Sequence, residues 1–294
     1  MFALALGVAA CGDGNPFTQA PSAGGGATSS GVIFGTDLND DLTMNGLVYQ
    51  DNGTADPTDD TLVINNLPFD NSDVAGGAYT REGALPNGFD RYESPLLGNP
   101  GERKYFAVFR RTAFAQVAAV GTGDYIDKGF GGLTAQRIGA GAVPAARPAT
   151  YTFTGDYAAV RVTTLDGGED DVEFVTGDAT LYVDVLDFDV NGAVEGIVDN
   201  RELFDCAGNS LGTLNDFLSL ATAEIDFANA SINSSTASNL EGGNELGTGE
   251  WQGIFAGPNG EQIAGIVVIE GDVTSTEPND TVRETGTLIV VNGG

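Results

Sequence analysis

The sequence predicts an all-β protein, in which an eight-stranded antiparallel up-and-down soluble β-barrel follows a smaller β-rich handle-like region. Short stretches rich in Thr, Val, Ile, Tyr and Phe alternate with clusters of Gly, Asn and Asp, as is typical of strands joined by tight turns. The 294 residues include 43 glycines. The segment from Arg81 to Arg147 holds nine of the 12 basic residues but six of the 42 acidic ones, which indicates two structural units.

The chain starts with a short apolar run, Phe2–Ala10, that ends in Val8-Ala9-Ala10-Cys11. The run is too short to span a bilayer as a helix. Small residues before a Cys resemble the bacterial lipobox, in which the Cys is lipidated and becomes the mature N-terminus. No Lys or Arg precedes the run, as a secretory signal requires, so we expect the true translation start to lie upstream. Residues 1–11 are therefore interpreted as a lipoprotein signal segment, with lipidation at Cys11.

Residues 12–30 are rich in Gly, Ser, Ala and Pro, which is the composition of a flexible tether. In lipoproteins an Asp directly after the lipidated Cys favours retention in the inner membrane. Here that position is Gly12. The resemblance therefore predicts an outer-membrane lipoprotein, held by its lipid anchor and with possible exposure at the cell surface.

The handle-like region is assigned to residues 31–147. Its expected strands are Val32–Phe34, Leu47–Tyr49, Leu62–Leu67, Lys104–Phe109 and Ala115–Val120. The acidic loops between the first strands leave open a calcium site, because calcium takes six to eight oxygen ligands. Their spacing fits no calcium-loop pattern, so solvated turns are the favoured interpretation.

Four basic residues flank the later strands of this region: Arg103, Lys104, Arg110 and Arg111. These residues either form a basic patch for an acidic partner or make ion pairs with acidic residues of the same protein. We favour the internal ion pairs. The proline-bearing stretch Ala140–Pro148 is a plausible boundary before the next unit.

Residues 148–294 are assigned to the barrel. The stretch Tyr151–Ala159 alternates apolar and polar residues with a period of two, and Asn191-Gly192 is a strong hairpin signal. Leu214, Phe217, Leu218 and Ala221 have helical spacing and predict one short helix. The remaining expected strands are 170–178, Thr180–Val190, Ala193–Val198, Ala223–Phe227, Trp251–Phe255, Gln262–Ile269 and Glu284–Val291. About eight meandering strands suit a closed barrel, which has no exposed sheet edge.

A membrane-spanning barrel is the alternative to a soluble one. It needs a continuous apolar outer band with aromatic girdles. Acidic residues lie within or at the ends of the expected strands, namely Glu173, Asp184, Asp187, Asp189, Glu195, Glu224 and Asp226. This pattern favours the soluble barrel.

A further pattern lies at Trp251–Gly265. It resembles the closing hairpin of the barrel domain in transferrin-binding-protein-B-like surface lipoproteins. The matching residues are Gly253, Phe255, Gly257, Pro258 and Gly265. The chain resembles this family also at Ala149–Tyr157, its first barrel strand. Gln262, Gly260, Ala256 and Ala264 depart from the family pattern. The resemblance implies a surface binding lipoprotein, while the motif itself is interpreted as a structural hairpin without binding residues.

Composition limits the function. A formal net charge of −30 disfavours nucleic acid and anionic lipid surfaces, and the sequence contains no His, the usual general base and metal ligand. No phosphate loop, nucleophile–base pair or metal-ligand cluster is recognisable. We therefore expect no enzyme and no cofactor, and we expect Cys206, beside Asp205 and Glu202, to be a buried, inert thiol.

The favoured function is an outer-membrane-anchored binding protein that captures a protein, haem or another nutrient. A non-catalytic structural surface lipoprotein remains an alternative. A third possibility is a barrel that holds a small apolar molecule, with Trp251, Phe153, Tyr157 and Phe227 lining the cavity. The sequence names no ligand.

Overall fold

The computed structural model describes residues 31–35, 42, 44, 46–65, 78–95, 104–123, 131–164, 170–185, 192–273 and 280–293. Within these ranges the protein consists of antiparallel strands and one short 3-10 turn, η2 (Pro57–Asp59). Cys11 and the expected tether lie outside the described residues. Among the helices described, none has the length and apolar character needed to cross a membrane.

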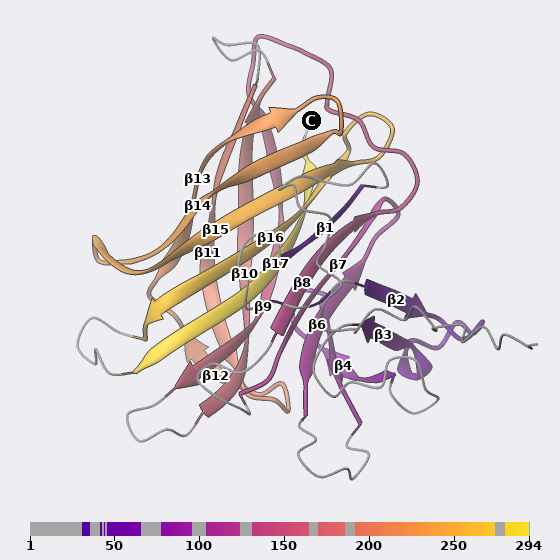
Figure 1. The fold of residues 1–294 in the computed structure, drawn as a ribbon, viewed down its shortest axis with the longest axis vertical. Helices are drawn as coiled ribbons and strands as arrows, with labels where there is room; N and C mark the ends of the chain where they lie inside the picture. Colours follow the sequence, from indigo (N-terminus) through magenta and orange to yellow (C-terminus); the bar gives the residue numbers. More distant parts are fainter. Residues whose placement is uncertain are drawn as a thin grey trace, which may run out of the picture.

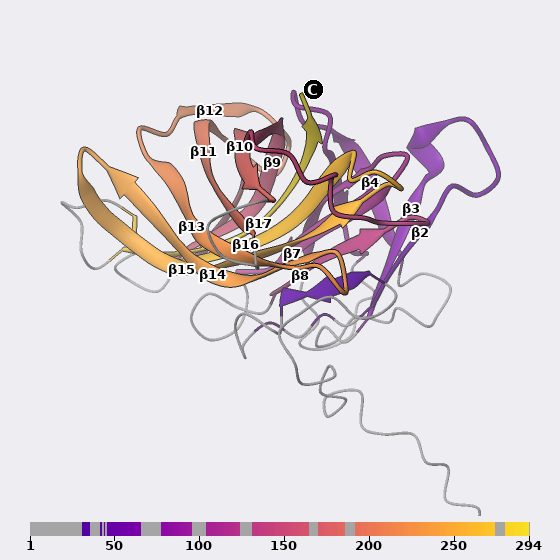
Figure 2. The same ribbon diagram turned by 90° about the horizontal axis from the view of Figure 1, so that it is seen from above.

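The second half of the chain forms a closed barrel, called the barrel below. Its strands are β9 (Tyr151–Thr164), β10 (Asp170–Asp184), β11 (Ala193–Phe204), β12 (Ser210–Thr213), β13 (Phe217–Asp226), β14 (Ser231–Glu241), β15 (Asn244–Ala256), β16 (Gln262–Asp272) and β17 (Thr281–Asn292). Eight of them form a ring in chain order, because β10 pairs with β11 and the last strand, β17, pairs with the first, β9. The short β12 adds to the edge of β11. The predicted eight-stranded up-and-down barrel is confirmed (Figures 1 and 2).

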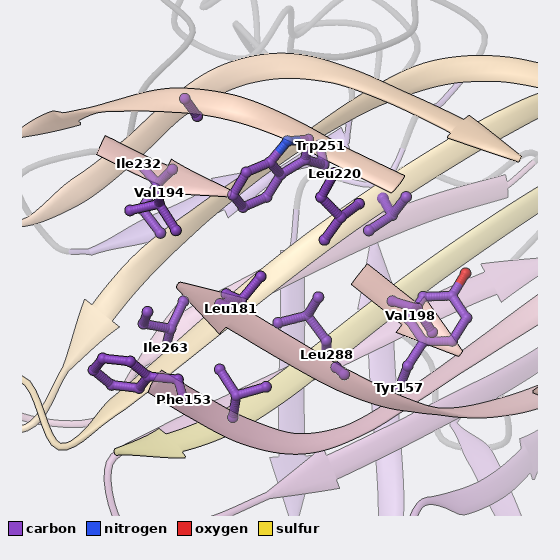
Figure 3. Packing of buried hydrophobic residues seen from close by; sticks show 14 of the residues in the cluster. Phe153, Tyr157, Leu181, Val194, Val198, Leu220, Ile232, Trp251, Ile263 and Leu288 are labelled. Atoms are coloured by element: carbon purple, nitrogen blue, oxygen red, sulfur yellow. The ribbon is translucent and has the colours of Figure 1, made fainter. Parts of the chain in front are cut away.

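The barrel strands alternate between two apolar faces. On β9, Phe153, Tyr157 and Ala159 face the interior, while Ala158 and Val160 face outward to a second core. Strands β15, β16 and β17 alternate in the same way, whereas the outward faces of β13 and β14 are polar and partly exposed. The interior is filled by side chains from all round the ring (Figure 3). This period of two is what the sequence pattern predicts for strands buried on both faces.

The first half forms the handle-like sheet, a curled antiparallel sheet beside the barrel (Figure 2). Its strands are β1 (Val32–Phe34), β2 (Gly46–Gln50), β3 (Thr61–Asn65), β4 (Tyr79–Ala84), β5 (Asp90–Glu93), β6 (Phe106–Arg111), β7 (Ala115–Gly121) and β8 (Gly131–Arg137). Strands β2 to β8 meander from neighbour to neighbour, and β1 returns to pair with β8. The sheet curls around its own small core, which includes Leu62, Tyr79, Tyr92 and Phe109.

The two sheets share one apolar core. Val108, Val117 and Leu133 of the handle-like sheet pack in the same cluster as Ile254 and Ile266 of the barrel wall. Since burial of apolar surface stabilises by about 25 cal/mol per Å², this shared layer holds the barrel and the sheet together.

The strand boundaries correct several expectations. Segments 170–178 and 180–184 belong to one strand, β10, so the expected break between them is wrong. Strand β14 was not expected, because its sequence SINSSTASNLE is mostly polar. Because one strand was counted as two and another was missed, the expected number of barrel strands still agrees with the eight observed. The handle-like sheet also contains β4, β5 and β8, which the sequence pattern did not predict.

The predicted helix at Leu214–Ala221 is wrong. Leu218 and Ala221 lie on strand β13, which pairs with β11 and β14. The interior side chains on β13 are Leu218, Leu220, Ala223 and Ile225, and a register shift opposite Val194 and Gly196 inserts one extra residue. Of the residues with helical spacing, Leu218 faces the interior whereas Ala221 is exposed, so that spacing does not mark one buried face.

Candidate functional site

Most of the barrel interior is a packed core. Phe153, Tyr157 and Trp251 are fully buried in it, and the Trp251 Nε1 donates a hydrogen bond to the carbonyl of Ala221 at 2.9 Å. Phe227 lies elsewhere, 45% exposed at the surface. Phe153, Tyr157 and Trp251 pack in the interior core (Figure 3) and Phe227 does not, so these four side chains do not line a common cavity.

Toward one end the interior changes from apolar to charged. Arg201 is fully buried and forms ion pairs with Asp216 and Glu284. Tyr157 donates to Glu284 at 2.7 Å, and the Asn239 amide donates to Asp216 at 2.8 Å. We call these five residues the buried ion network.

The buried ion network shifts the pKa values of its members. Burial lowers the pKa of Arg201, but the carboxylates of Glu284 and Asp216 raise it by more, so the guanidinium stays charged. Burial raises the pKa of Tyr157, and the neighbouring Glu284 raises it further. The network thus places one guanidinium between two carboxylates inside the barrel, with the Arg201 Nε left without a hydrogen-bond partner among the described residues.

Above the network, a hollow of about 350 Å³ opens at the mouth of the barrel. Its walls come from β9, β10 and β11, from the end of β12 and the segment after it, from the hairpin of β14 and β15, and from the residue after β16. Four carboxylates, one guanidinium and several apolar side chains line it: Asp171, Glu173, Asp216, Glu241, Arg161, Leu203, Leu214, Leu246 and Val273, with Thr163, Thr213 and Asn215. We call this hollow the mouth pocket.

Arg161 and Glu173 meet across the wall of the mouth pocket. They are register partners on β9 and β10, and the Arg161 Nε lies 4.0 Å from the Glu173 Oε2. Burial raises the pKa of Glu173, and Asp171 and Glu284 raise it further, although Arg161 opposes them. The pocket therefore holds a carboxylate whose charge is poorly compensated.

The family-pattern residues lie away from the mouth pocket. Gly253 and Gly265 are direct cross-strand partners on β15 and β16, and a Cβ on Gly265 would meet the Leu288 side chain at 3.1 Å. Phe255 is buried, with its ring 6.5 Å from that of Phe153. Pro258 is exposed in the hairpin turn.

Gly257 joins this turn to the connection between the two sheets. Its φ is +90°, and a Cβ there would lie 2.1 Å from the Glu261 Oε2. Its backbone N–H donates to the carbonyl of Ala140 at 3.0 Å, and its carbonyl accepts from Ala142 at 3.1 Å. Glycine is favoured here because other residues rarely adopt positive φ.

The basic residues flanking the handle-like strands are engaged internally. Lys104 pairs with Glu93, and Arg110 pairs with Asp156 of the barrel. Arg111 donates to Gln116 at 2.7 Å and stacks over the Tyr49 ring. Arg103 lies outside the described residues. For Lys104 and Arg110, pairing with the protein's own acids is confirmed.

The acidic loop before β3 is organised as turns. Asp56 accepts from the backbone of Thr58 at 3.0 Å, and Asp59 accepts from Thr54 at 2.8 Å. Within the part of the chain that the structure describes, no group of three or more His, Cys, Asp or Glu side chains has a metal-binding arrangement.

Cys206 is a free, partly buried thiol. Its Sγ donates to the carbonyl of Val172 at 3.1 Å. Burial raises the pKa of this thiol to about 11, with Glu93 and Asp205 adding to the effect. A thiol with such a pKa is a poor nucleophile near neutral pH.

Sequence reasoning missed the residues of the buried ion network and the mouth pocket. Three basic residues lie outside the segment from Arg81 to Arg147, each within a barrel strand: Arg161, Arg201 and Arg283. An isolated Arg in a barrel strand is costly to bury unless it is paired, and that was the available signal.

Comparison with known proteins gives no match to a family model and no match to a curated protein. Among solved structures, the chain is similar to a double mutant of Transferrin Binding Protein B from Haemophilus parasuis Hp5, with 12% identity and a TM-score of 0.38 over 85% of this chain and 45% of that one. The chain thus spans about half the length of that protein.

Two further solved structures are similar to 61% of this chain, and each match covers 80% of the other chain. One is described as a surface lipoprotein, with 13% identity and a TM-score of 0.32. The other is a Transferrin Binding Protein B mutant from Actinobacillus pleuropneumoniae H49, with 11% identity and a TM-score of 0.31.

Proposed function

We propose that the protein is a lipid-anchored binding protein of the outer membrane, which captures a protein or a small nutrient and catalyses no reaction. Residues 12–30 act as the tether, and residues 31–147 and 148–294 form the handle-like and barrel units that it presents. The observation that carries the proposal is the mouth pocket, because the mouth of a closed barrel is a common place for ligand binding.

The construction around the pocket suits binding better than catalysis. The packed interior and the buried ion network form a rigid floor, and the shared core fixes the handle-like sheet to the outer wall. A rigid, preformed site loses little conformational entropy when a ligand binds. The alternative is a structural surface lipoprotein, which would bind nothing at this pocket.

Lipid attachment is tested by metabolic labelling with an alkyne fatty acid. We expect the wild-type chain and the Cys206→Ser variant to be labelled and the Cys11→Ser variant to be unlabelled, because Cys11 is the acceptor. The Cys206→Ser variant controls for labelling at the second cysteine. Equal labelling of the Cys11→Ser variant would contradict the anchor.

Surface exposure and capture are tested on the same cells. Protease treatment of intact cells is expected to remove the protein, and the purified Cys11→Ser chain is expected to retain a ligand from growth medium or host fluid. A protein that survives shaving and retains nothing would support the structural alternative instead.

A further inference from the structure

We infer that the mouth pocket binds a small zwitterion, a molecule that carries both an ammonium and a carboxylate on a compact apolar body, such as a free apolar amino acid. This inference rests on the proposed function and names the class of ligand. It follows from three properties of the pocket, which are its unmatched donors, its excess of carboxylates and its apolar wall.

The unmatched donors call for an anionic group. Arg161 and Thr163 line the pocket, and their residues are 4% and 6% exposed. The Arg161 Nε and the Thr163 Oγ1 are buried without a hydrogen-bond partner among the described residues. A buried polar group without a partner costs about 1–3 kcal/mol. A ligand carboxylate would satisfy both groups, since guanidinium and hydroxyl are standard carboxylate donors.

The placement of these donors follows from the strand order. Arg161 lies on β9 between Glu173 of β10 and Glu284 of β17. The second of these acids is already held by Arg201 and Tyr157. Arg161 therefore keeps the single contact of 4.0 Å to Glu173 among the ion pairs of the described residues, and its remaining donors are available to a ligand.

The excess of carboxylates calls for a cationic group. Asp216 is neutralised by Arg201, which leaves Asp171, Glu173 and Glu241 against the one guanidinium of Arg161. Burial is the main cause of the raised pKa of Glu173, and the neighbouring carboxylates Asp171 and Glu284 add to it. A ligand ammonium beside these acids would stabilise their charged forms. A metal ion does not fit, because these carboxylates form no cluster of metal-ligand geometry.

The size and the apolar wall limit the rest of the ligand. A volume of about 350 Å³ lies at the small end of ligand pockets, which run from about 300 to 1,000 Å³. Leu203, Leu214 and Leu246 give the pocket an apolar side. A molecule that places two opposite charges a few bonds apart beside an alkyl or aryl group matches this lining.

The test uses the full Cys11→Ser chain and three kinds of probe in titration calorimetry. The probes are the free amino acids L-leucine, L-methionine and L-phenylalanine, their amides, which keep only the ammonium, and their N-acetyl derivatives, which keep only the carboxylate. We expect at least one free amino acid to bind. Its amide and its N-acetyl derivative should each bind more weakly by about tenfold or more, because each lacks one charged contact.

Variants locate the binding site. Arg161→Gln and Thr163→Val are expected to weaken binding of the free amino acid, by about tenfold or more for Arg161→Gln. Arg147→Gln is the matched control, because Arg147 lies outside the pocket and bonds to backbone carbonyls near Tyr151. The near-ultraviolet signal of the buried Trp251 checks that each variant is folded. If Arg161→Gln does not fold, Thr163→Val, which keeps the side-chain shape, still decides the question.

Three results would overturn the inference: an amide or N-acetyl derivative that binds as tightly as its parent, binding unchanged in Arg161→Gln or Thr163→Val, or no binding of any free amino acid. None of these would by itself overturn the proposed function, which is tested by labelling, shaving and capture. Conversely, if the protein is neither lipidated nor exposed at the cell surface, the proposed function fails, but binding of the amino acid in the mouth pocket can still be measured.

Discussion

At the scale of single residues, the most consequential side chain is Arg201. It brings a full positive charge into the barrel interior and is compensated there by Asp216 and Glu284. Its inward direction depends on a β-bulge in β11, where Asn200 adopts a φ of +49° and the register to β10 shifts. The same guanidinium pairs with Asp216, which lines the mouth pocket.

Replacing Arg201 by Met is expected to destabilise the fold by about 3–5 kcal/mol, because removal of one partner leaves buried carboxylates uncompensated. The free energy of unfolding from urea titration measures the effect. Arg147→Met serves as the control and should change it by about 0.5 kcal/mol or less. A loss below about 1 kcal/mol in Arg201→Met would contradict the role of the buried ion network.

Cys206 gives a second prediction at this scale. With a pKa of about 11, its thiolate fraction at pH 8 is about one in a thousand, against roughly a quarter for an ordinary cysteine of pKa about 8.5. In the Cys11→Ser chain, we expect slow alkylation by iodoacetamide, with a rate that rises about tenfold per pH unit through pH 10. A rate that levels off below pH 9 would show that the thiol is not perturbed.

At the scale of elements, the sequence predicted strands best where one or both faces are apolar. The alternation at Tyr151–Ala159 and the hairpin motif at Trp251–Gly265 lie on β9 and across β15 and β16. Strand β14 was missed because the outward side chains are Ser, Thr and Asn, so few apolar residues reveal its period. On β13, Leu218 faces the interior whereas Ala221 is exposed, so the helical spacing of these apolar residues did not reflect one buried face.

The candidate site was less predictable than the strands. Arg161 and Glu173 lie on consecutive strands, but Glu284 is distant in sequence, and only the pairing of β9 with β17 brings it beside them. The order of charged residues along the chain does not reveal that Glu284 lies beside Arg161, because the pairing of β17 with β9 depends on closure of the ring. Cys11 lies outside the described residues, and its lipidation stays a prediction.

A glycine on β17 tests how the elements fit. A Cβ on Gly286 would lie 1.9 Å from the Tyr157 hydroxyl oxygen. Gly286→Ala must therefore displace the Tyr157 side chain, whose hydroxyl donates to Glu284. We expect a loss of about 1–3 kcal/mol in the free energy of unfolding, the usual cost of overpacking. In Gly265→Ala the added Cβ meets the side chain of Leu288 at 3.1 Å, and the loss should be smaller. Equal losses would contradict this packing.

At the scale of the whole molecule, the uneven charge of the sequence has a structural use. The basic segment lies in the handle-like sheet, and its arginines reach across to the barrel. Arg110 pairs with Asp156, Arg91 donates to the carbonyl of Cys206, and Arg137 donates to that of Phe255 at 2.8 Å. The basic residues concentrated in the first half of the chain therefore contribute directly to the contact between the handle-like sheet and the barrel.

Closure of the barrel brings together the strands that carry the mouth pocket and the buried ion network. Because β17 returns to β9, Glu284 lies beside Arg161, which lines the mouth pocket. In an open sheet these two residues would lie on opposite edges. The buried ion network would then be exposed to water, and the pocket would lose its floor.

An engineered disulfide between the first and last barrel strands tests this closure most directly. Thr154 and Val291 are register partners with exposed side chains, and directly opposed residues of antiparallel strands have Cα atoms about 4.5–5.5 Å apart, within disulfide range. In a chain with Cys11→Ser and Cys206→Ser, we predict that Thr154→Cys with Val291→Cys forms an intramolecular disulfide, seen by peptide mapping without reduction. The control, Thr154→Cys with Ala221→Cys on β13, should keep two free thiols. Free thiols in the Thr154 and Val291 pair under oxidising conditions would contradict the closed barrel.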